Sequence, residues 1–194
     1  WNVMDSEAFT SSRDLLLQCF HAARDAVHGR RVVEEALRRD PIGGPVHLVA
    51  LGKAAGAMGL GAVSRLGDGI ARGLVVTRRG YGEAALARDE RFACLEADHP
   101  LPGASSLAAG RALLDFIAST PRDGILLFLI SGGSSSLVEV LPSGLDLEDL
   151  RRMNAWLLAS GLDIHAVNRV RSEVSCIKAG RLRAWLDGRD ARAL

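Results

Sequence analysis

Two glycines and four serines follow the most apolar run of the sequence. Residues 124–130 read GILLFLI, and residues 131–136 directly after them read SGGSSS. Adjacent glycines let backbone N–H groups face a ligand without a Cβ atom in the way, and the start of a following helix adds further unpaired N–H donors. Such donors bind a phosphate or a carboxylate. The same residues could instead form a tight strand-to-helix turn whose serines cap the helix, so both interpretations stay open.

A lysine follows another apolar run, within the segment GKAAG at residues 52–56. If the apolar run is a strand and a helix follows, Lys53 projects into the crevice beyond the strand, where its ammonium could meet a phosphate or a developing alkoxide. The glycine spacing matches neither GxGxxG nor GxxxxGK[ST], so both standard nucleotide-binding motifs are missing. A lysine at a helix start can also be a solvated residue, and this alternative stays open.

A histidine lies between an acid and a proline in the segment DHPLPG, residues 98–103. His99 could orient a substrate carboxylate or act as a base. A histidine held in a rigid loop can equally serve as a structural hydrogen-bonding group. The segment favours neither role by itself.

A denser polar cluster occurs in residues 163–171, which read DIHAVNRVR. If Asp163 caps a helix, His165, Asn168 and Arg171 recur at a spacing of three and fall on neighbouring positions of its surface. Histidine, asparagine and arginine beside an anion-binding loop suit the recognition of a carboxylate or a phosphate. A solvated helix face is the alternative.

The pattern of the whole chain alternates between strands and helices, which must position these motifs. Strands are predicted at residues 46–51, 73–77, 92–96 and 124–130. Helices are predicted at residues 15–23 with a cap at 11–12, and at 27–39, 54–66, 105–117, 145–158 and 164–174, with a further one starting at 178–181. Strands that alternate with helices of this length indicate βαβ units. The predicted fold is therefore an α/β, Rossmann-like domain in three α/β/α layers with a mainly parallel sheet.

Every candidate motif comes after the carboxyl end of a predicted strand. In open parallel sheets, ligands bind in the crevice outside those ends, so we expect the motifs to surround one crevice. No linker rich in glycine, serine or proline divides the chain, and we expect residues 1–194 to form one domain. Residues 187–190 read DGRD, a turn signal after which an apolar strand should begin. We therefore expect the chain to be part of a longer protein.

Composition excludes several functions. The net charge is +1, from 24 Lys and Arg against 23 Asp and Glu, which argues against binding a nucleic acid backbone. No apolar run approaches the roughly 20 residues of a membrane span, and no secretory segment opens the chain. Cys19, Cys94 and Cys176 form no CxxC pattern, so neither a zinc site nor a disulfide framework is indicated and a reducing cytoplasm is expected. We expect a small-molecule substrate as partner; the oligomeric state, a homo-oligomer included, stays open.

Taken together, four segments carry a resemblance to a known family. They are GKAA at residues 52–55, DHPLPG at 98–103, LFLISGGSSSL at 127–137 and DIHAVNRVRSEVSCIKAGRL at 163–182. In order and spacing they resemble the amino-terminal domain of the class II glycerate 2-kinase family, whose members have also been labelled hydroxypyruvate reductases and end in a second domain known as MOFRL. Ser134 replaces the third glycine of the usual SGGGS, and Ala179 replaces the first glycine of the usual IKGG. Both changes reduce backbone freedom near the expected ligand.

The resemblance implies an enzyme that transfers the γ-phosphoryl group of ATP to the 2-hydroxyl of D-glycerate with a divalent metal such as Mg²⁺. It implies that Lys53 is catalytic and stabilises charge on the transferring group. The residues implied in phosphate or nucleotide binding are Gly52, Ser131, Gly132, Gly133, Ser134 and Ser135. Those implied on the substrate side are His99, His165, Asn168, Arg171 and Lys178. The metal ligands would belong to the MOFRL domain, which this chain is expected to lack, so the chain alone is expected to be inactive.

Two other functions stay open. The first is an NAD(P)H-dependent hydroxypyruvate reductase, against which count the missing GxGxxG motif and the absence of a ribose-binding acid after the second strand, where residues 76–78 read VTR. The second is a non-catalytic module that binds a sugar acid or a phosphosugar.

Overall fold

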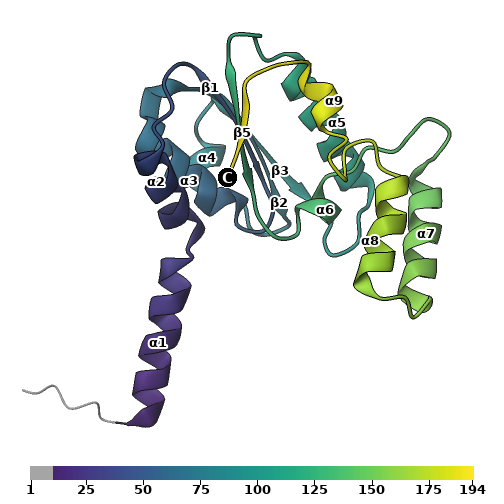
Figure 1. Cartoon of the computed structure of the whole chain (residues 1–194), viewed down its shortest axis with the longest axis horizontal. Coiled ribbons are helices and arrows are strands. Elements are labelled where there is room, and N and C mark those ends of the chain that lie inside the picture. The colour runs from purple at the N-terminus through teal and green to yellow at the C-terminus, as the bar shows by residue number, and fades with distance from the viewer. Residues whose placement is uncertain (1–10) are drawn as a thin grey trace, which may run out of the picture.

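Five parallel strands form one sheet in the computed structural model, which describes residues 11–194 (Figure 1). The strands are β1 (Val46–Leu51), β2 (Ile70–Arg78), β3 (Phe92–Ala97), β4 (Ile125–Ile130) and β5 (Ala191–Ala193). Their order is β3-β2-β1-β4-β5, and every neighbouring pair is parallel. The four predicted strands are confirmed, and β5 begins after the turn where a further strand was expected.

Helices cover both faces of the sheet, which confirms the three-layer architecture (Figure 1). All six residues of β1 are buried, because a parallel strand covered on both faces needs residues that can leave water at every position. On one face lie α2 (Gly29–Arg39), α3 (Ala55–Leu66) and α4 (Ala84–Ala87), and on the other lie α5 (Ala104–Ala118), α6 (Ser134–Leu137) and α9 (Arg183–Leu186). The central strands are therefore a rigid platform, and solvent reaches the sheet mainly at its edge strands and at the strand ends.

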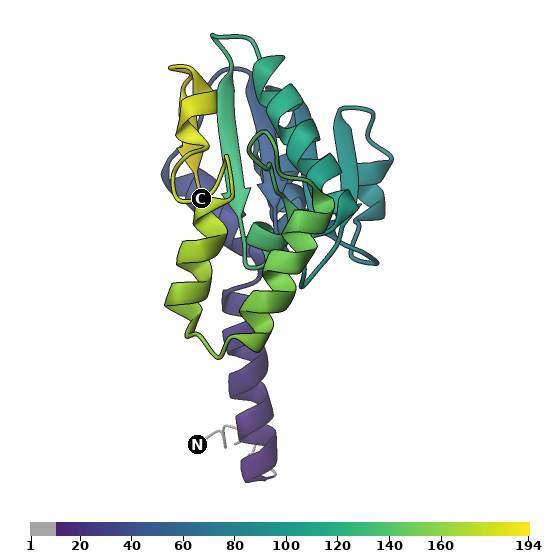
Figure 2. The ribbon, with the colours of Figure 1, turned by 90° about the vertical axis from the view of Figure 1, so that its right-hand side faces the viewer.

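Two helices form a hairpin that extends beyond the sheet, beside the ends of its strands (Figure 2). They are α7 (Leu147–Ala159) and α8 (Ile164–Glu173), close to the predicted bounds. Asp146 caps α7 by accepting from the N–H of Asp149 at 2.9 Å, and Asp163 caps α8 by accepting from the N–H of Ala166 at 2.9 Å. These caps fix where each helix begins.

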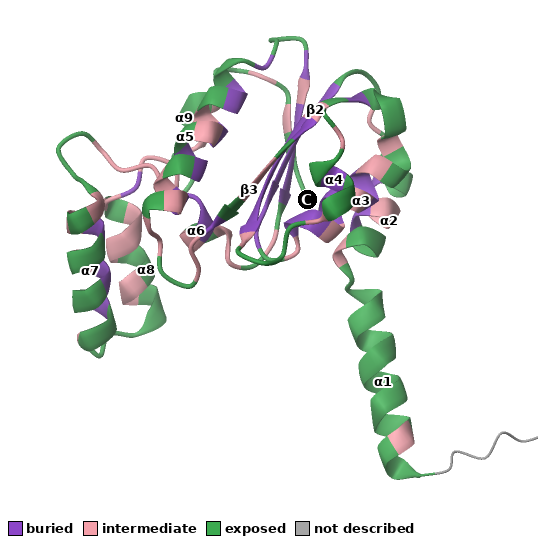
Figure 3. Ribbon diagram, turned by 180° about the vertical axis from the view of Figure 1, so that it is seen from behind, coloured by how far each residue is buried: buried purple, intermediate pink, exposed green. Residues whose placement is uncertain are grey.

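The first helix, α1 (Ser12–Ala26), projects away from the sheet (Figures 1 and 3). Ser11 caps it as predicted, and it is separate from α2. None of its residues is buried; Leu16 and Phe20 are 71% and 62% exposed.

None of the helices between residues 11 and 194 combines the length and apolar character that a membrane span requires.

The helix expected to start at residues 178–181 begins later, as α9. Ala179 has φ +50° and Gly180 has φ +83°, and these left-handed conformations form a turn instead of a right-handed helix. A residue with a Cβ atom is strained there, whereas glycine is not. Ser134, the other departure from the family pattern, has no positive φ and lies in α6, so glycine is not required at that position.

Ala179→Gly should therefore stabilise the fold by about 1 kcal/mol, since relief of left-handed strain exceeds the entropic cost of glycine. Ala155→Gly is the control, because Ala155 is exposed inside α7 and the same replacement there should destabilise by about 1 kcal/mol. Urea unfolding of both variants measures the difference. An equal loss of unfolding free energy in Ala179→Gly and Ala155→Gly would mean that Ala179 carries no backbone strain.

Candidate functional site

The loops after β1 and β4 lie side by side at the carboxyl edge of the sheet. From β1 the chain runs to β2 and β3 on one side, while β4 and β5 lie on the other. The gap between β1 and β4 is thus the topological switch point, where ligands bind in open parallel sheets. Lys53 follows β1 and the SGGSSS turn follows β4, so both motifs lie at this point.

Hydrogen bonds join the two loops into one unit. The N–H of Lys53 donates to the carbonyl of Gly132 at 2.9 Å, and the N–H of Ser131 donates to the carbonyl of Leu51 at 2.9 Å. The Ser131 hydroxyl donates to Leu51 at 3.2 Å and accepts from the N–H of Ala54 at 3.1 Å. The Ser131 side chain therefore connects the loops, and the loop backbone is left as the surface for a ligand.

Glycine is required at residue 52 because the loops approach so closely. Gly52 has φ +120°, and a Cβ atom there would lie 2.5 Å from the carbonyl oxygen of Ser131. A Cβ atom this close to a backbone oxygen clashes with it in every side-chain rotamer, because the position of Cβ does not depend on the rotamer. The role of Gly52 is thus to let Lys53 enter the site beside the SGGSSS turn.

The SGGSSS turn presents unpaired N–H donors. Between residues 11 and 194, no protein atom accepts from the N–H groups of Gly132, Gly133 or Ser135. The helix that follows is α6, a single turn, so the donors come from the loop itself and the contribution of a helix dipole is smaller than expected from the sequence. Three free donors on a glycine turn suit an anion.

The side chains of Lys53 and His99 both lie close to Gly133. A Cβ atom at Gly133 would be 3.2 Å from Cγ of Lys53 and 3.0 Å from Nε2 of His99. Lys53 is exposed and precedes α3 by two residues, and its ammonium forms no hydrogen bond with residues 11–194. The amine is therefore available to an anion bound at the turn.

Two clefts adjoin between this turn and the α7–α8 hairpin. The large cleft, about 390 Å³, is lined by Leu51, Leu113, Ile130, Ser134, Ser135, Val138, Asn168, Arg171, Ser172, Ile177, Lys178, Ala179 and Leu182. The small cleft, about 140 Å³, is lined by Pro100, Pro102, Gly133, Ser135, Ser136, Glu139, Leu150, Met153, Asn154, Asn168, Arg171 and Lys178. Ser135, Asn168, Arg171 and Lys178 line both. The structure thus brings four of the predicted residues together.

His165 and Arg169 lie elsewhere: both are exposed and line neither cleft. Asn168 and Arg171 face the clefts, so the polar residues of α8 divide between two sides of the helix. The spacing that places His165 near Asn168 does not determine which side faces the sheet. His165 is therefore the predicted substrate residue that the geometry supports least.

His99 belongs to a third cleft of about 340 Å³ at the ends of β2 and β3, which it lines with Arg78, Arg79 and Asp98. Asp98 accepts from the hydroxyl and the N–H of Ser105 in α5. The Ser105 hydroxyl, and to a lesser degree the Arg79 guanidinium, hold the pKa of the Asp98 carboxyl below its ordinary value. Asp98 is thus an ionised anchor for the loop that carries His99.

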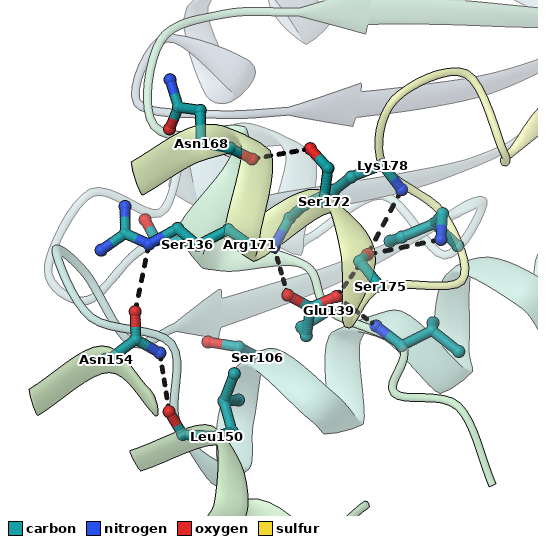
Figure 4. A network of polar contacts seen from close by, with 12 residues as sticks. Ser106, Ser136, Glu139, Leu150, Asn154, Asn168, Arg171, Ser172, Ser175 and Lys178 are labelled. Carbon is teal, nitrogen blue, oxygen red and sulfur yellow. Dashed lines mark hydrogen bonds and ion pairs between the residues drawn. The ribbon is translucent and has the colours of Figure 1, made fainter. Parts of the chain in front are cut away.

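A polar network that the sequence did not reveal supports the clefts (Figure 4). Nε of Arg171 donates to Oδ1 of Asn154 at 3.1 Å, and Nδ2 of the buried Asn154 donates to the carbonyl of Leu150 at 2.8 Å. The buried carboxylate of Glu139 pairs with Lys178. An acid inside the apolar segment LVEVL, residues 137–141, is the signal that could have found Glu139.

No group of three or more His, Cys, Asp or Glu side chains in residues 11–194 is arranged to hold a metal ion.

Lysine occurs only twice among the 24 Lys and Arg residues, as Lys53 and Lys178. Both lie at the switch-point site. An ammonium is a compact charge with rotatable donors, which arginine does not reproduce.

Residues 15–194 match the family described as Domain of unknown function (DUF4147). The chain belongs to this family. D-glycerate 2-kinase from Thermotoga maritima is 35% identical to this chain over 171 residues, which are 88% of this chain and 40% of that protein. Glycerate 2-kinase from Pyrococcus horikoshii is 37% identical over 147 residues, which are 76% of this chain and 32% of that protein.

A solved structure has the same fold as this DUF4147 chain. The crystal structure of glycerate kinase from Thermotoga maritima superposes with a TM-score of 0.83 at 33% identity, covering 93% of this chain and 42% of that one. The chain spans less than half the length of the curated relatives it matches. The resemblance stated from the four sequence segments is confirmed at the level of the family and the fold.

Proposed function

We propose that this chain is the amino-terminal part of an ATP-dependent D-glycerate 2-kinase. The observation that carries the proposal is the position of Lys53 beside three unpaired N–H donors of the SGGSSS turn, next to clefts lined by Arg171 and Lys178. One side of the site suits a phosphate chain and the other suits a carboxylate. Its relatives named glycerate 2-kinase support the choice of substrate.

Phosphoryl transfer asks mainly for positioning and for stabilisation of negative charge. In the proposed reaction, the oxygen of the 2-hydroxyl bonds to the γ-phosphorus of ATP, the bond from that phosphorus to the bridging oxygen breaks, and ADP leaves. Lys53 and the turn N–H groups would bind the phosphoryl oxygens. Arg171 and Lys178 would bind the carboxylate of D-glycerate, with Asn168 beside them. The proton of the 2-hydroxyl would be released to water in the overall reaction.

Mg²⁺ would neutralise phosphate charge when bound to ATP. The described residues do not fit a protein-bound Mg²⁺ site, because the two clefts that share Lys178 contain a single carboxylate, Glu139, which is paired with Lys178. We propose that any protein ligands to the metal lie in the part of the relatives that this chain does not cover.

The reductase alternative has less support. A dinucleotide needs a glycine turn that admits a pyrophosphate after β1 and an acid after β2 for the ribose. The turn after β1 is instead closed by Ser131, and β2 ends at Thr77 and Arg78. The SGGSSS turn after β4 is the open one.

The complete gene product should convert ATP to ADP in the presence of D-glycerate and form 2-phosphoglycerate. We expect turnover with D-glycerate, little with L-glycerate, and no oxidation of NADH or NADPH with hydroxypyruvate. Phosphorus NMR of the product distinguishes 2-phosphoglycerate from the 3-phospho isomer. Oxidation of NADH without ADP formation would support the reductase instead, and binding of D-glycerate without either reaction would support a binding module.

A further inference from the structure

A carboxylate is buried behind the two clefts. Glu139 is 2% exposed and lies between Val138 and Val140, just after α6. Its Oε1 accepts from the N–H of Val140 at 3.0 Å and from the hydroxyl of Ser175 at 2.6 Å, and its Oε2 accepts from Nζ of Lys178 (Figure 4). Both carboxylate oxygens are thus satisfied, and the Lys178 side chain is 14% exposed.

Stability alone does not explain this pair. Removing a carboxylate and an ammonium from water costs free energy that their attraction only partly offsets, and apolar residues of similar size are often as stable in the same place. The residues next to Glu139 in the sequence are apolar, and Leu137 and Val138 are both buried in the core. An ion pair here is better explained by what it holds in place.

The backbone around Glu139 is rigid. Its N–H donates to the carbonyl of Ser106 at 3.1 Å, and a Cβ atom at Gly110 would lie 2.0 Å from the Glu139 carbonyl oxygen, so α5 packs directly against it. The N–H of Cys176 donates to the carbonyl of Val140 at 2.8 Å. The backbone of Glu139 is therefore fixed to α5, and the segment that carries Lys178 is fixed to the backbone of the next residue, Val140.

Lys178 lines both clefts, and its ammonium donates only to Glu139 among the residues that the structure describes. An ammonium has three donors, so two are free. Arg171 is the other charged group lining both clefts, and Asn154 holds it at 3.1 Å. Each cation of the shared wall thus has its own polar support.

We propose that Glu139 is a positioning residue, which holds the Lys178 ammonium at the wall shared by the two clefts with two donors toward an anionic substrate group. Naming that group as the carboxylate of D-glycerate rests on the proposed function. Ser175 completes the arrangement by fixing the rotation of the Glu139 carboxylate.

A double-mutant cycle on the complete gene product tests whether Glu139 acts through Lys178. Glu139→Gln should lower kcat/KM for D-glycerate by roughly 10- to 100-fold, because a displaced ammonium no longer meets the substrate. In a Lys178→Met background the same change should alter kcat/KM by less than about 2-fold. A Glu139→Gln loss of the same size in both backgrounds would show that Glu139 does not act through Lys178.

Controls separate positioning from folding. Glu173→Gln removes an exposed acid of α8 whose partner is Arg181, and it should leave kcat/KM unchanged. Lys178→Met leaves a buried carboxylate unpaired and should lower Tm, whereas the double variant should recover part of that loss. Glu139→Asp keeps the charge on a shorter side chain and should restore part of the activity lost in Glu139→Gln.

A second measurement on the chain itself does not depend on enzymatic activity. With two lysines in the sequence, NMR of lysine labelled with ¹⁵N shows two side-chain ammonium groups, and Lys53→Ala assigns them. Glu139→Gln should shift or broaden the Lys178 signal and leave that of Lys53 unchanged. An unchanged Lys178 signal would overturn the proposal, whereas a changed signal in a protein without kinase activity would refute the proposed function alone.

Discussion

Lys53→Ala should lower kcat for phosphorylation of D-glycerate by about 10²- to 10³-fold, the usual cost of removing one charge-stabilising contact from a transition state. The ammonium is free to bind a phosphoryl oxygen, because Lys53 forms its hydrogen bond to Gly132 through the backbone. The side chain is exposed, so thermal stability should change little. Steady-state kinetics of the complete gene product, with melting curves in parallel, measures both effects.

Two controls make this prediction specific. Lys53→Arg keeps the charge but replaces a compact ammonium with a planar guanidinium, and should recover only part of the rate. Arg65→Ala removes an exposed cation from the opposite end of α3 and should have no effect on kcat. If Lys53→Ala retains near-normal kcat, Lys53 is a solvated residue and the catalytic cation lies elsewhere.

Gly133→Val should weaken the affinity for ADP by at least about 100-fold, equivalent to the loss of one to two charge-assisted hydrogen bonds. A side chain at Gly133 would press on Lys53 and His99 and would strain a backbone at φ +93°. The unpaired N–H groups of the SGGSSS turn would then no longer point toward a single bound phosphate. Calorimetric titration with ADP measures the affinity, and circular dichroism confirms that the sheet is intact.

Gly132→Ala is the matched control for this turn. Gly132 has no positive φ, and a Cβ atom there would meet only Cε of Lys53, at 3.9 Å. Binding of ADP should therefore stay within a few-fold of that of the unsubstituted chain. Normal ADP affinity in a folded Gly133→Val protein would mean that the SGGSSS turn is not the phosphate site.

The sheet and the place of the site could be predicted from the sequence for one physical reason. Strands covered on both faces need buried residues at nearly every position, so β4 stands out as a continuous apolar run and β1 as an apolar run with one polar residue, His47. Parallel strands bring their carboxyl ends to one edge, which places Lys53 beside Gly133 although 80 residues separate them.

The supports of the site could not be predicted in the same way. Glu139 and Lys178 meet across 39 residues, and their pairing depends on how α5, α6 and the turn at Ala179 pack, which no local pattern records. The direction that His165 faces depends likewise on how α8 lies against the sheet. The periodicity of α1 shows which of its positions are apolar, but not whether a neighbour covers them.

The isolation of α1 has a consequence for how this chain unfolds. A helix of 15 residues with no buried side chain and little contact beyond α2 is close to the limit of stability in water, because nucleation is costly and each added residue gains little. It forms its own cooperative unit with an opening free energy near zero, separate from that of the sheet. The main unfolding transition therefore reports on the layered domain from α2 onward, and its denaturant slope reflects the surface buried there.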